Sequence, residues 1–304
     1  MKGNCSLSVL ILTLNEEKHL RRCLKSISQI ANEIIIIDSF SNDRTKEIAD
    51  EFGAKFFQNN FISQSGQLIW AFSNIKFESK WILRIDADEY VTNELLLEIK
   101  DKLRLVEKDV NGISLNRFIK FQGHIIKYGG ICPTRVLRIF RNGCCKCEDR
   151  LMDEHFIVDG KKISFQNPLI DDNLNSLSWW IKKHNGYSSR EAIEILNLKY
   201  KFKKIYKYES RIGNKMSQRT RFLKNFVYYK FPFQLRSIFY FIYRYFIRLG
   251  FLDGIRGFTF HFLQAFWYRY LVDAKVYEFE KSISSKKLSI DQALLKFFDY
   301  VVDD

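Results

Sequence analysis

An apolar segment of this chain runs directly into a cluster of carboxylates. Residues 81–85 are followed at once by Asp86, Asp88 and Glu89. Ligands of α/β sheets bind outside the carboxyl ends of the strands, and carboxylate oxygens suit Mg²⁺ or Mn²⁺ that holds a diphosphate. The pattern therefore predicts a divalent metal site at the end of a strand and a nucleotide substrate that carries a group for transfer. The alternative is a solvated turn that leads into a helix over residues 92–105.

Strands and helices alternate through the first third of the chain. Residues 34–37 are an unbroken isoleucine run, which is typical of a strand covered on both faces, as in parallel sheets. Residues 16–27 place apolar side chains three and four positions apart, which is typical of an amphipathic helix. The expected strands are residues 7–14, 34–37, 54–58 and 81–85, and the expected helices are residues 16–27, a segment ending at residue 52, and residues 64–75 and 92–105. This alternation predicts βαβ units in a three-layer α/β domain.

The pattern changes in the middle of the chain. Residues 112–165 contain short apolar segments separated by glycines and a proline, which predicts mixed or antiparallel strands that complete the sheet. These strands are expected at residues 113–121, 125–128 and 136–140. Residues 176–198 then show helical spacing, with Trp179 and Trp180 on the apolar side. The two tryptophans either stack on a sugar ring or belong to a core or an interface.

The excess positive charge sits in one region. The net charge is +14 at pH 7, and residues 199–275 hold 17 Lys and Arg against three acidic residues, together with 24 of the 48 aromatic residues. Charges interrupt the apolar runs, so no stretch there reaches the roughly 18 uncharged residues that a spanning helix needs. Basic residues interleaved with aromatic ones predict helices that lie at a membrane interface and are attracted by anionic headgroups. The alternatives are a homo-oligomer interface and a surface for single-stranded nucleic acid.

The amino terminus and the cysteines favour a cytoplasmic protein. The first residues do not resemble a signal peptide, because the apolar run that follows them ends in Asn15, Glu16 and Glu17. Six cysteines fit reduced thiols in that compartment. The cysteine-rich residues 144–147 lack the spacing of a zinc knuckle, so buried or loop thiols are the better interpretation.

Polar side chains also follow the first two expected strands. Asn15, Glu16 and Glu17 follow the first strand, and Asp38 and Ser41 follow the second. A carboxylate or amide at such a strand end can hydrogen-bond a base or a ribose hydroxyl, and the alternative is a helix cap. No Gly-x-Gly-x-x-Gly follows the first strand and no Gly-Lys-Ser/Thr occurs, which counts against a Rossmann dehydrogenase and a P-loop enzyme. Nucleotide binding would then depend on side chains and a metal.

The order of these motifs resembles the family-2 glycosyltransferases of the GT-A fold. The matching segments are residues 12–17, 36–45 and 86–89, and the resemblance continues through Gly129, Gly130, Arg135, Arg138, Asp153, Glu154, residues 250–254 and Gly257. Within that family the chain resembles the lipopolysaccharide-core glucosyltransferase group called WaaE or KdtX. Where that group has His-Glu, this chain has Asp153-Glu154 with His155 one place further on.

The resemblance implies roles around the nucleotide. Asp38 would contact the uracil or another base, and Glu16 or Glu17 would help to hold the nucleoside. Asp86 would address the ribose, and Asp88 would be the ligand for Mg²⁺ or Mn²⁺. The metal would neutralise the charge that develops on the departing diphosphate.

The resemblance also implies a phosphate clamp and a base. Arg135 and Arg138 would bind phosphate bidentately, although alternation along a strand equally places arginines in solvent. Gln67 is a candidate donor contact in the third helix, where this chain has apolar residues in place of the group's basic ones. Glu154 would be the general base, with Asp153 as the alternative. The complete donor-binding set is Asn15, Glu16, Glu17, Asp38, Ser41, Gln67, Asp86, Arg135 and Arg138.

Together the resemblance and the charge pattern imply an inverting glycosyltransferase that moves a sugar from a nucleotide sugar, a UDP-sugar, to a lipid-linked glycan of lipopolysaccharide or another surface polysaccharide. The expected fold is α/β, with a GT-A-like three-layer domain and mixed sheet over residues 1–198 and a basic aromatic helical region over residues 199–304. Residues 1–110 would form the nucleotide-binding half and residues 111–198 the acceptor half.

The expected location is the inner face of the cytoplasmic membrane, where the protein would be peripheral. A homo-oligomer is possible on this interpretation. Nucleic acid is not expected as a partner. The alternative functions are a nucleotidyltransferase that makes a sugar nucleotide and a basic nucleic-acid-binding protein.

Overall fold

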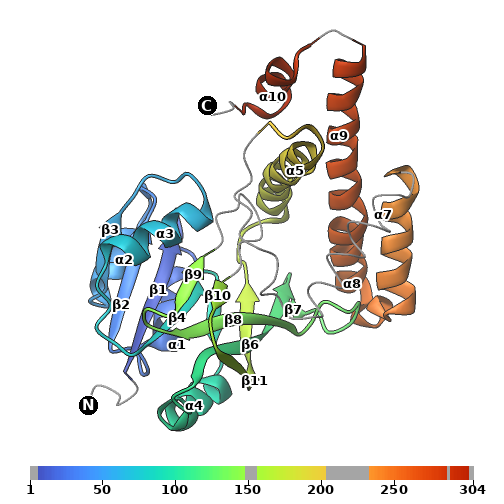
Figure 1. Cartoon of the computed structure of the whole chain (residues 1–304). Coiled ribbons are helices and arrows are strands. Elements are labelled where there is room, and N and C mark those ends of the chain that lie inside the picture. Colours follow the sequence, from blue (N-terminus) through green and yellow to red (C-terminus); the bar gives the residue numbers. More distant parts are fainter. Residues whose placement is uncertain (1–5, 148–155, 203–232, 286–287, 301–304) are drawn as a thin grey trace. The chain divides into compact units, whose positions relative to one another are not determined.

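A computed structural model of the chain describes residues 6–147, 156–202, 233–285 and 288–300 (Figure 1). The chain divides into two compact units, Met1–Asn175 and Ser176–Asp304. The first unit is α/β and the second is helical (Figure 1).

The first unit is built on one mixed sheet. Four parallel strands form its first part, in the order β3 (Lys55–Gln58), β2 (Glu33–Asp38), β1 (Leu7–Thr13) and β4 (Trp81–Asp86). The sheet continues from β4 through β8 (Thr134–Arg141), β6 (Val110–Phe121), β11 (Lys161–Asp172) and β5 (Glu89–Val91), and β7 (His124–Ile125) pairs with β6. In this second part only β6 and β11 are parallel, so the predicted mixed sheet is confirmed.

The sheet curls upon itself at the carboxyl end of β4. The strand order separates β4 from β5 by three other strands, which would be roughly 19 Å in a flat sheet. Asp86 ends β4 and Glu89 begins β5, and three residues span at most about 11 Å. The strands in between must therefore curve around this point. As a result, side chains from β6, β8 and β11 surround the turn at residues 87–88.

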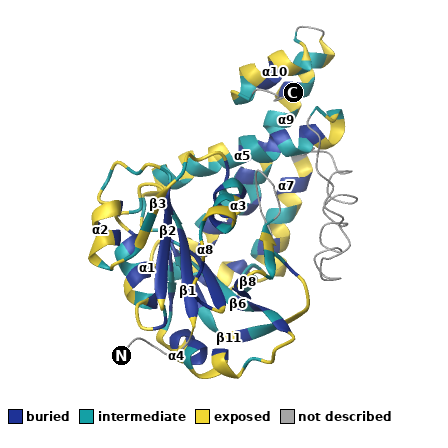
Figure 2. Ribbon diagram, turned by 60° about the vertical axis from the view of Figure 1, so that its left-hand side comes forward, coloured by how far each residue is buried: buried dark blue, intermediate teal, exposed yellow. Residues whose placement is uncertain are grey.

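Helices cover both faces of the sheet, as its alternating burial requires. Val9 and Ile11 of β1 belong to a core with helices α1 (Leu20–Ile27), α2 (Thr45–Glu51) and α4 (Asn93–Lys102). Leu10, on the other face, belongs to a second core with helix α3 (Gln64–Asn74) and the small β9–β10 sheet (Cys145–Cys147 and Phe156–Val158). Successive strand residues point to opposite faces, and strands β1 and β2 are buried on both faces (Figure 2). The three-layer prediction is thus confirmed.

The second unit contains the long helix α5 (Leu177–Tyr200) together with α7 (Phe233–Ile242), α8 (Gly254–His261), α9 (Tyr268–Ser284) and α10 (Ile290–Phe298). Two π-helical turns, Tyr243–Ile247 and Phe262–Trp267, and a 3-10 turn, Gly250–Asp253, link α7, α8 and α9. No helix in the described parts of the chain combines the length and the apolarity that crossing a bilayer requires.

The boundary between the units lies before α5, not after it as predicted. Ala192 of α5 packs with Tyr268 and Val272 of α9, and Leu196 packs with Phe279 and Leu294. The helical spacing of α5 predicted its apolar face correctly but did not show that this face is covered by α9. Because α5 shares its core with later helices, it belongs to the second unit.

Glu98 of α4 accepts hydrogen bonds from backbone N–H groups at an irregularity in the pairing of β6 and β11. The register of this strand pair shifts between Ser164 and Pro168. The Glu98 carboxylate, 6% exposed, accepts from the backbone N–H groups of Gln166 and Asn167 at 2.9–3.1 Å. Burial opposes ionisation of Glu98, but hydrogen bonds from Lys102 and from these N–H groups outweigh it and hold its pKa below the ordinary 4.5.

We predict that Glu98→Gln lowers the free energy of unfolding by about 1–3 kcal/mol at neutral pH, because the N–H groups of Gln166 and Asn167 lose a charged acceptor. A depressed pKa stabilises the folded state above the unfolded value of 4.5, and this contribution is lost as pH falls through the folded pKa. The gap between wild type and Glu98→Gln, measured by urea unfolding, should therefore narrow below pH 4.5. Glu94→Gln, an exposed position of the same helix, is the control, and a gap that does not change with pH would contradict the assignment.

Candidate functional site

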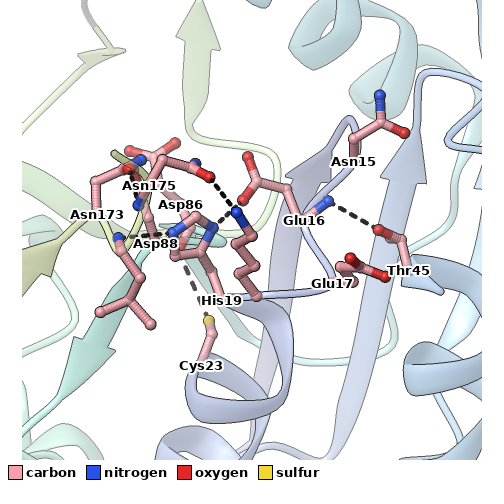
Figure 3. A network of polar contacts seen from close by, with 12 residues as sticks. Asn15, Glu16, Glu17, His19, Cys23, Thr45, Asp86, Asp88, Asn173 and Asn175 are labelled. Carbon is pink, nitrogen blue, oxygen red and sulfur yellow. Dashed lines mark hydrogen bonds and ion pairs between the residues drawn. The ribbon is translucent and has the colours of Figure 1, made fainter. Parts of the chain in front are cut away.

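The loops after β1 and β2 hold each other through hydrogen bonds. The backbone N–H of Asn15 donates to Ser41 Oγ at 2.7 Å, and Asn15 Oδ1 accepts from the N–H of Asn42 at 2.9 Å. The N–H of Glu16 donates to Thr45 Oγ1 at 2.8 Å (Figure 3). Asn15 has a φ of +56°, a conformation that asparagine adopts more readily than most residues. Asn15, Glu16 and Ser41 therefore lie together at the carboxyl edge of the parallel strands.

Asp38 is buried between these loops. Its Oδ1 accepts from Thr13 Oγ1 at 2.8 Å and from Ser41 Oγ at 2.5 Å, and its Oδ2 accepts from the N–H of Ser41 at 2.8 Å. Asp38 is 0% exposed, so its carboxylate shapes the loop after β2 in the manner of an Asx turn. Contact between Asp38 and a nucleotide base stays a prediction, and in this geometry it requires the Ser41 loop to move.

Glu17 and Gln67 differ in what they offer to a ligand. Glu17 is exposed, and its Oε2 accepts from the N–H of Arg44 at 3.3 Å. Gln67 is 1% exposed, and its Nε2 donates to the carbonyl oxygens of Asn59 and Asn60 at 2.9 Å. The amide of Gln67 thus ties the loop after β3 to α3. Its position does not support the predicted contact with the donor, because the amide is buried against the protein's own backbone.

A cluster of charged side chains lies inside the curl of the sheet. Its members are Arg84, Asp86, Glu89, Arg117, Arg138 and Asp171, and we call it the charged cluster. Asp86 accepts from Arg84 at 2.7 Å and from Arg138 at 2.8 Å. Arg138 also forms an ion pair with Glu89, which is 1% exposed. The predicted ribose contact, Asp86, is therefore already neutralised by two guanidinium groups.

The position of Arg138 follows from an irregularity in β8. The register between β6 and β8 shifts so that Ile113 pairs with Ile139 and Ser114 with Leu137, which leaves Arg138 without a cross-strand partner. Bulges of this kind re-aim a side chain. Arg138 is consequently 5% exposed and points to the carboxylates, whereas Arg135 on the same strand is exposed. The structure does not bring Arg135 and Arg138 together as the predicted phosphate clamp.

Burial affects the ionisation of Glu89 most strongly. Burial raises the pKa of Glu89 well above its ordinary value, and the negative charge of Asp86 acts in the same direction. The guanidinium of Arg117, 3.8 Å from Glu89, opposes this shift. Burial and Asp86 thus favour the protonated form of Glu89, whereas the arginines of the charged cluster favour its ionised form.

Asp88 has a different environment from Asp86. Its side chain is half-buried, and within the described part of the chain its carboxylate is contacted by Asn173, whose Nδ2 donates to Oδ2 at 3.0 Å (Figure 3). Its backbone oxygen accepts from the N–H of Asp172 at 3.1 Å and from Arg22 at 3.2 Å. The backbone of Asp88 is thus fixed while its carboxylate is contacted by a neutral amide. A carboxylate with a fixed backbone and no cationic partner among the described residues is suited to bind a metal ion.

Asp88 fits the part of a single protein ligand for Mg²⁺ or Mn²⁺. No group of three or more His, Cys, Asp or Glu side chains suited to a metal occurs among the described residues. Mg²⁺ is commonly held by one or two carboxylates together with substrate phosphates and water, so a three-residue cage is not required. The carboxylate of Asp88 fits this donor set, whereas that of Asp86 is occupied by Arg84 and Arg138.

His19 and Arg22, which no sequence motif indicated, hold the loop after β11 against the start of α1. His19, 1% exposed, lies with Nδ1 2.6 Å from Glu16 Oε2, and its Nε2 accepts from the N–H of Leu174 at 2.9 Å. Arg22 donates to Asp172 Oδ2 at 2.6 Å. The one available signal was the spacing of His19, three residues after Glu16, which places both on one side of a helical turn. The remaining contacts join residues about 150 positions apart, which no local pattern reveals.

The predicted base lies outside the described residues. Asp153 and Glu154 both fall in the segment between β9 and β10 that the structure does not describe. Their assignment stays a prediction.

The comparison with protein families concerns the part of the chain that contains these residues. Residues 8–142 match the family model described as glycosyl transferase family 2. This part of the chain is thus similar to the glycosyltransferases of family 2. The matched residues run from β1 to β8 and include Asp38, Asp86, Asp88 and Arg138, and the fold around them is GT-A-like. The prediction of a glycosyltransferase is confirmed at this level, and the likeness to the lipopolysaccharide-core group stays a prediction.

Curated relatives carry the same general name. An uncharacterized glycosyltransferase of Rickettsia bellii is 27% identical over 212 residues, which cover 62% of this chain and 67% of that protein. Another, from Rickettsia typhi, is 27% identical over 294 residues, or 90% of this chain and 87% of that protein. The 4,4'-diaponeurosporenoate glycosyltransferase of Staphylococcus haemolyticus is 40% identical over 100 residues, which cover 31% of this chain and 27% of that protein.

Solved structures show a more distant likeness. Glucosyl-3-phosphoglycerate synthase of Mycobacterium tuberculosis, solved with Mn²⁺, UDP and glucosyl-3-phosphoglycerate, is 20% identical. The match covers 38% of this chain and 44% of that chain, with a TM-score of 0.32.

We predict that Arg138→Met lowers the free energy of unfolding by about 3–5 kcal/mol, because it leaves the buried Glu89 and Asp86 without their shared partner. Arg135→Met is the matched control on the same strand, and we expect it to change stability by no more than about 0.5 kcal/mol. Chemical unfolding of both variants measures the difference. Adding Glu89→Gln to Arg138→Met should restore part of the loss, and equal stability of the two arginine variants would refute the role of the charged cluster.

Proposed function

We propose that this protein is an inverting glycosyltransferase that uses a UDP-sugar and acts on a lipid-linked saccharide at the membrane surface. The observation that carries the proposal is the contrast at the end of β4. There Asp86 is neutralised by two arginines, whereas Asp88 presents a carboxylate contacted by a neutral amide. The match to glycosyltransferase family 2, which includes both residues, supports sugar transfer as the reaction.

In this proposal Asp88 holds a divalent cation together with the diphosphate of the donor. The bound cation would supply Lewis-acid stabilisation of the charge on the leaving diphosphate. Asn173 and Arg22 keep Asp88 in position through its carboxylate and its backbone oxygen. The loops that carry Asn15, Glu16 and Ser41 lie at the same edge of the sheet and would receive the nucleoside.

The transfer step needs a base near the acceptor. A hydroxyl oxygen of the acceptor bonds to the anomeric carbon as the bond from that carbon to the diphosphate oxygen breaks, and the nucleoside diphosphate leaves with the electron pair. The hydroxyl proton passes to Glu154, or to Asp153 as the alternative. A base in this position contributes a factor of about 10² to 10⁴ in rate. Attack from the side opposite the leaving group gives inversion.

The experiment that tests the reaction class is a donor panel. UDP-glucose, UDP-galactose, UDP-N-acetylglucosamine and GDP-mannose would be assayed for hydrolysis and transfer, with and without Mg²⁺ or Mn²⁺ and with and without membranes. We expect turnover of a UDP-sugar that depends on the metal. Turnover that is equal in the presence of a chelator would reject the role of the cation.

We predict that Asp88→Ala lowers metal-dependent donor turnover by at least roughly 10²-fold, because several kcal/mol of charge stabilisation are lost. Asn173→Ala removes only the contact that orients Asp88, so we expect a rise of about 10–100-fold in the metal concentration needed for half-maximal turnover, with rescue at high Mn²⁺. Asp101→Ala, an exposed aspartate of α4, serves as the control. Full turnover by Asp88→Ala would remove the metal assignment.

We predict that Glu154→Gln retains donor binding and loses transfer, because the amide keeps the size of the side chain but does not accept a proton. Calorimetric titration with UDP measures binding, and product formation measures transfer. Asp153→Asn, tested alongside, separates the two candidates. Wild-type transfer by Glu154→Gln together with loss in Asp153→Asn would move the role to Asp153.

A further inference from the structure

The second unit exposes an apolar segment that links α7 to α8 and includes the first residues of α8. We call residues 246–258 the apolar tip. Seven large apolar side chains of this segment are between 41% and 75% exposed: Phe246, Ile247, Leu249, Phe251, Leu252, Ile255 and Phe258. Monomeric proteins rarely expose apolar side chains contiguously on this scale unless the surface binds a partner or a membrane.

The exposed apolar surface continues along α7. Leu235, Ile238, Phe239 and Ile242 are 39–53% exposed, and their spacing of three and four residues places them on one face of the helix. The inner face of α7 carries polar residues instead: Arg236 and Ser237 are 8% and 0% exposed. A helix of a soluble domain normally turns its apolar face inward. In α7 the two buried residues with described side chains, Arg236 and Ser237, are polar, whereas this outward face is apolar.

The acidic side chains of this region are buried. Asp253 and Asp273 are the acids between residues 233 and 275, and they are 6% and 3% exposed. Asp273 forms a two-pronged ion pair with Arg236. The exposed charges of the apolar tip are Arg248 and Arg256, so its surface combines apolar side chains with positive charge.

Close packing gives the apolar tip a fixed shape. A Cβ at Gly250 would lie 2.6 Å from the ring of His261, and a Cβ at Gly257 would lie 2.5 Å from Cβ of Asp253. Neither position has room for a side chain. The exposed side chains are therefore presented by a packed turn and not by an extended loop, which lowers the entropy lost when they bind a surface.

We infer that the apolar tip inserts into the headgroup region of an anionic lipid membrane, with Arg248 and Arg256 at the level of the phosphates. Residues of this composition bind the interface through buried apolar area and attraction to anionic lipids. A second copy of the chain fits less well, because a two-fold contact through the apolar tip would bring two positively charged surfaces together with no exposed acid in the tip to pair the arginines. The inference rests on the proposed function only in taking a membrane-bound acceptor as the substrate.

Flotation of the full chain with vesicles tests the inference. Wild type should float with vesicles of phosphatidylethanolamine and phosphatidylglycerol and less with phosphatidylcholine alone. Leu252→Ser combined with Ile255→Ser should lower partitioning by a factor on the order of ten or more, because the buried CH₂ groups that drive insertion are lost. Arg248→Gln combined with Arg256→Gln should remove the preference for anionic vesicles and its dependence on salt. Leu198→Ser with Leu295→Ser changes exposed apolar residues of the same unit outside the tip, 61% and 54% exposed, and is the control.

Hydrogen exchange adds a readout that identifies the segment. Anionic vesicles should slow exchange in residues 246–258 and leave α10 unchanged. Unaltered flotation of the Leu252 and Ile255 double variant, or a dimer that this variant dissociates without any effect on flotation, would overturn the inference. Thermal unfolding checks that the variants fold. Donor hydrolysis without membranes should persist in the tip variants, so failure of the membrane inference and failure of the proposed reaction are distinguishable.

Discussion

The charge balance inside the curled sheet determines what the carboxylates at the end of β4 can do. Three arginines, Arg84, Arg117 and Arg138, face three acids, Asp86, Glu89 and Asp171. Removing one partner from such a set leaves a buried charge uncompensated, which is costly. The positive and negative charges of this cluster are thus equal in number without Asp88. The two aspartates of the motif differ because one lies inside this set and the other lies outside it.

The curl of the sheet brings these groups together from distant parts of the sequence. Arg117 lies on β6, Arg138 on β8 and Asp171 on β11, and each reaches the turn after β4 because β5 returns to pair with β11. The same return positions Asp172 and Asn173 beside Asp88, and Arg22 of α1 donates to Asp172 and to the backbone oxygen of Asp88. Geometry at Asp88 therefore depends on long-range strand pairing more than on the local sequence of the motif.

The sequence predicted those features that depend on local periodicity. The isoleucine run of β2, the helical spacing of α1 and the carboxylates after β4 all gave correct element types, because burial on two faces or on one stripe leaves a direct trace in the residues. Local periodicity did not predict the contacts that Gln67 and Arg138 make. The contacts of Gln67 depend on where the loop after β3 passes, and Arg138 lies at a shift in strand pairing that no local pattern reveals. The end of the first unit was predicted after α5 for the same reason, because the apolar spacing of α5 is the same whichever unit covers its apolar face.

Charge in the second unit follows the same distinction between composition and placement. The sequence shows an excess of basic residues, but composition alone treats Asp253 and Asp273 as partial compensation for them. Both acids are buried and so absent from the surface, and Asp273 is paired with Arg236. Arg248 and Arg256 stay exposed among large apolar side chains, so the surface that a partner meets is more uniformly positive and apolar than the count of residues suggests. Attraction to an anionic interface and burial of apolar area then act within the same short segment but through different side chains, which is why separate substitutions distinguish them.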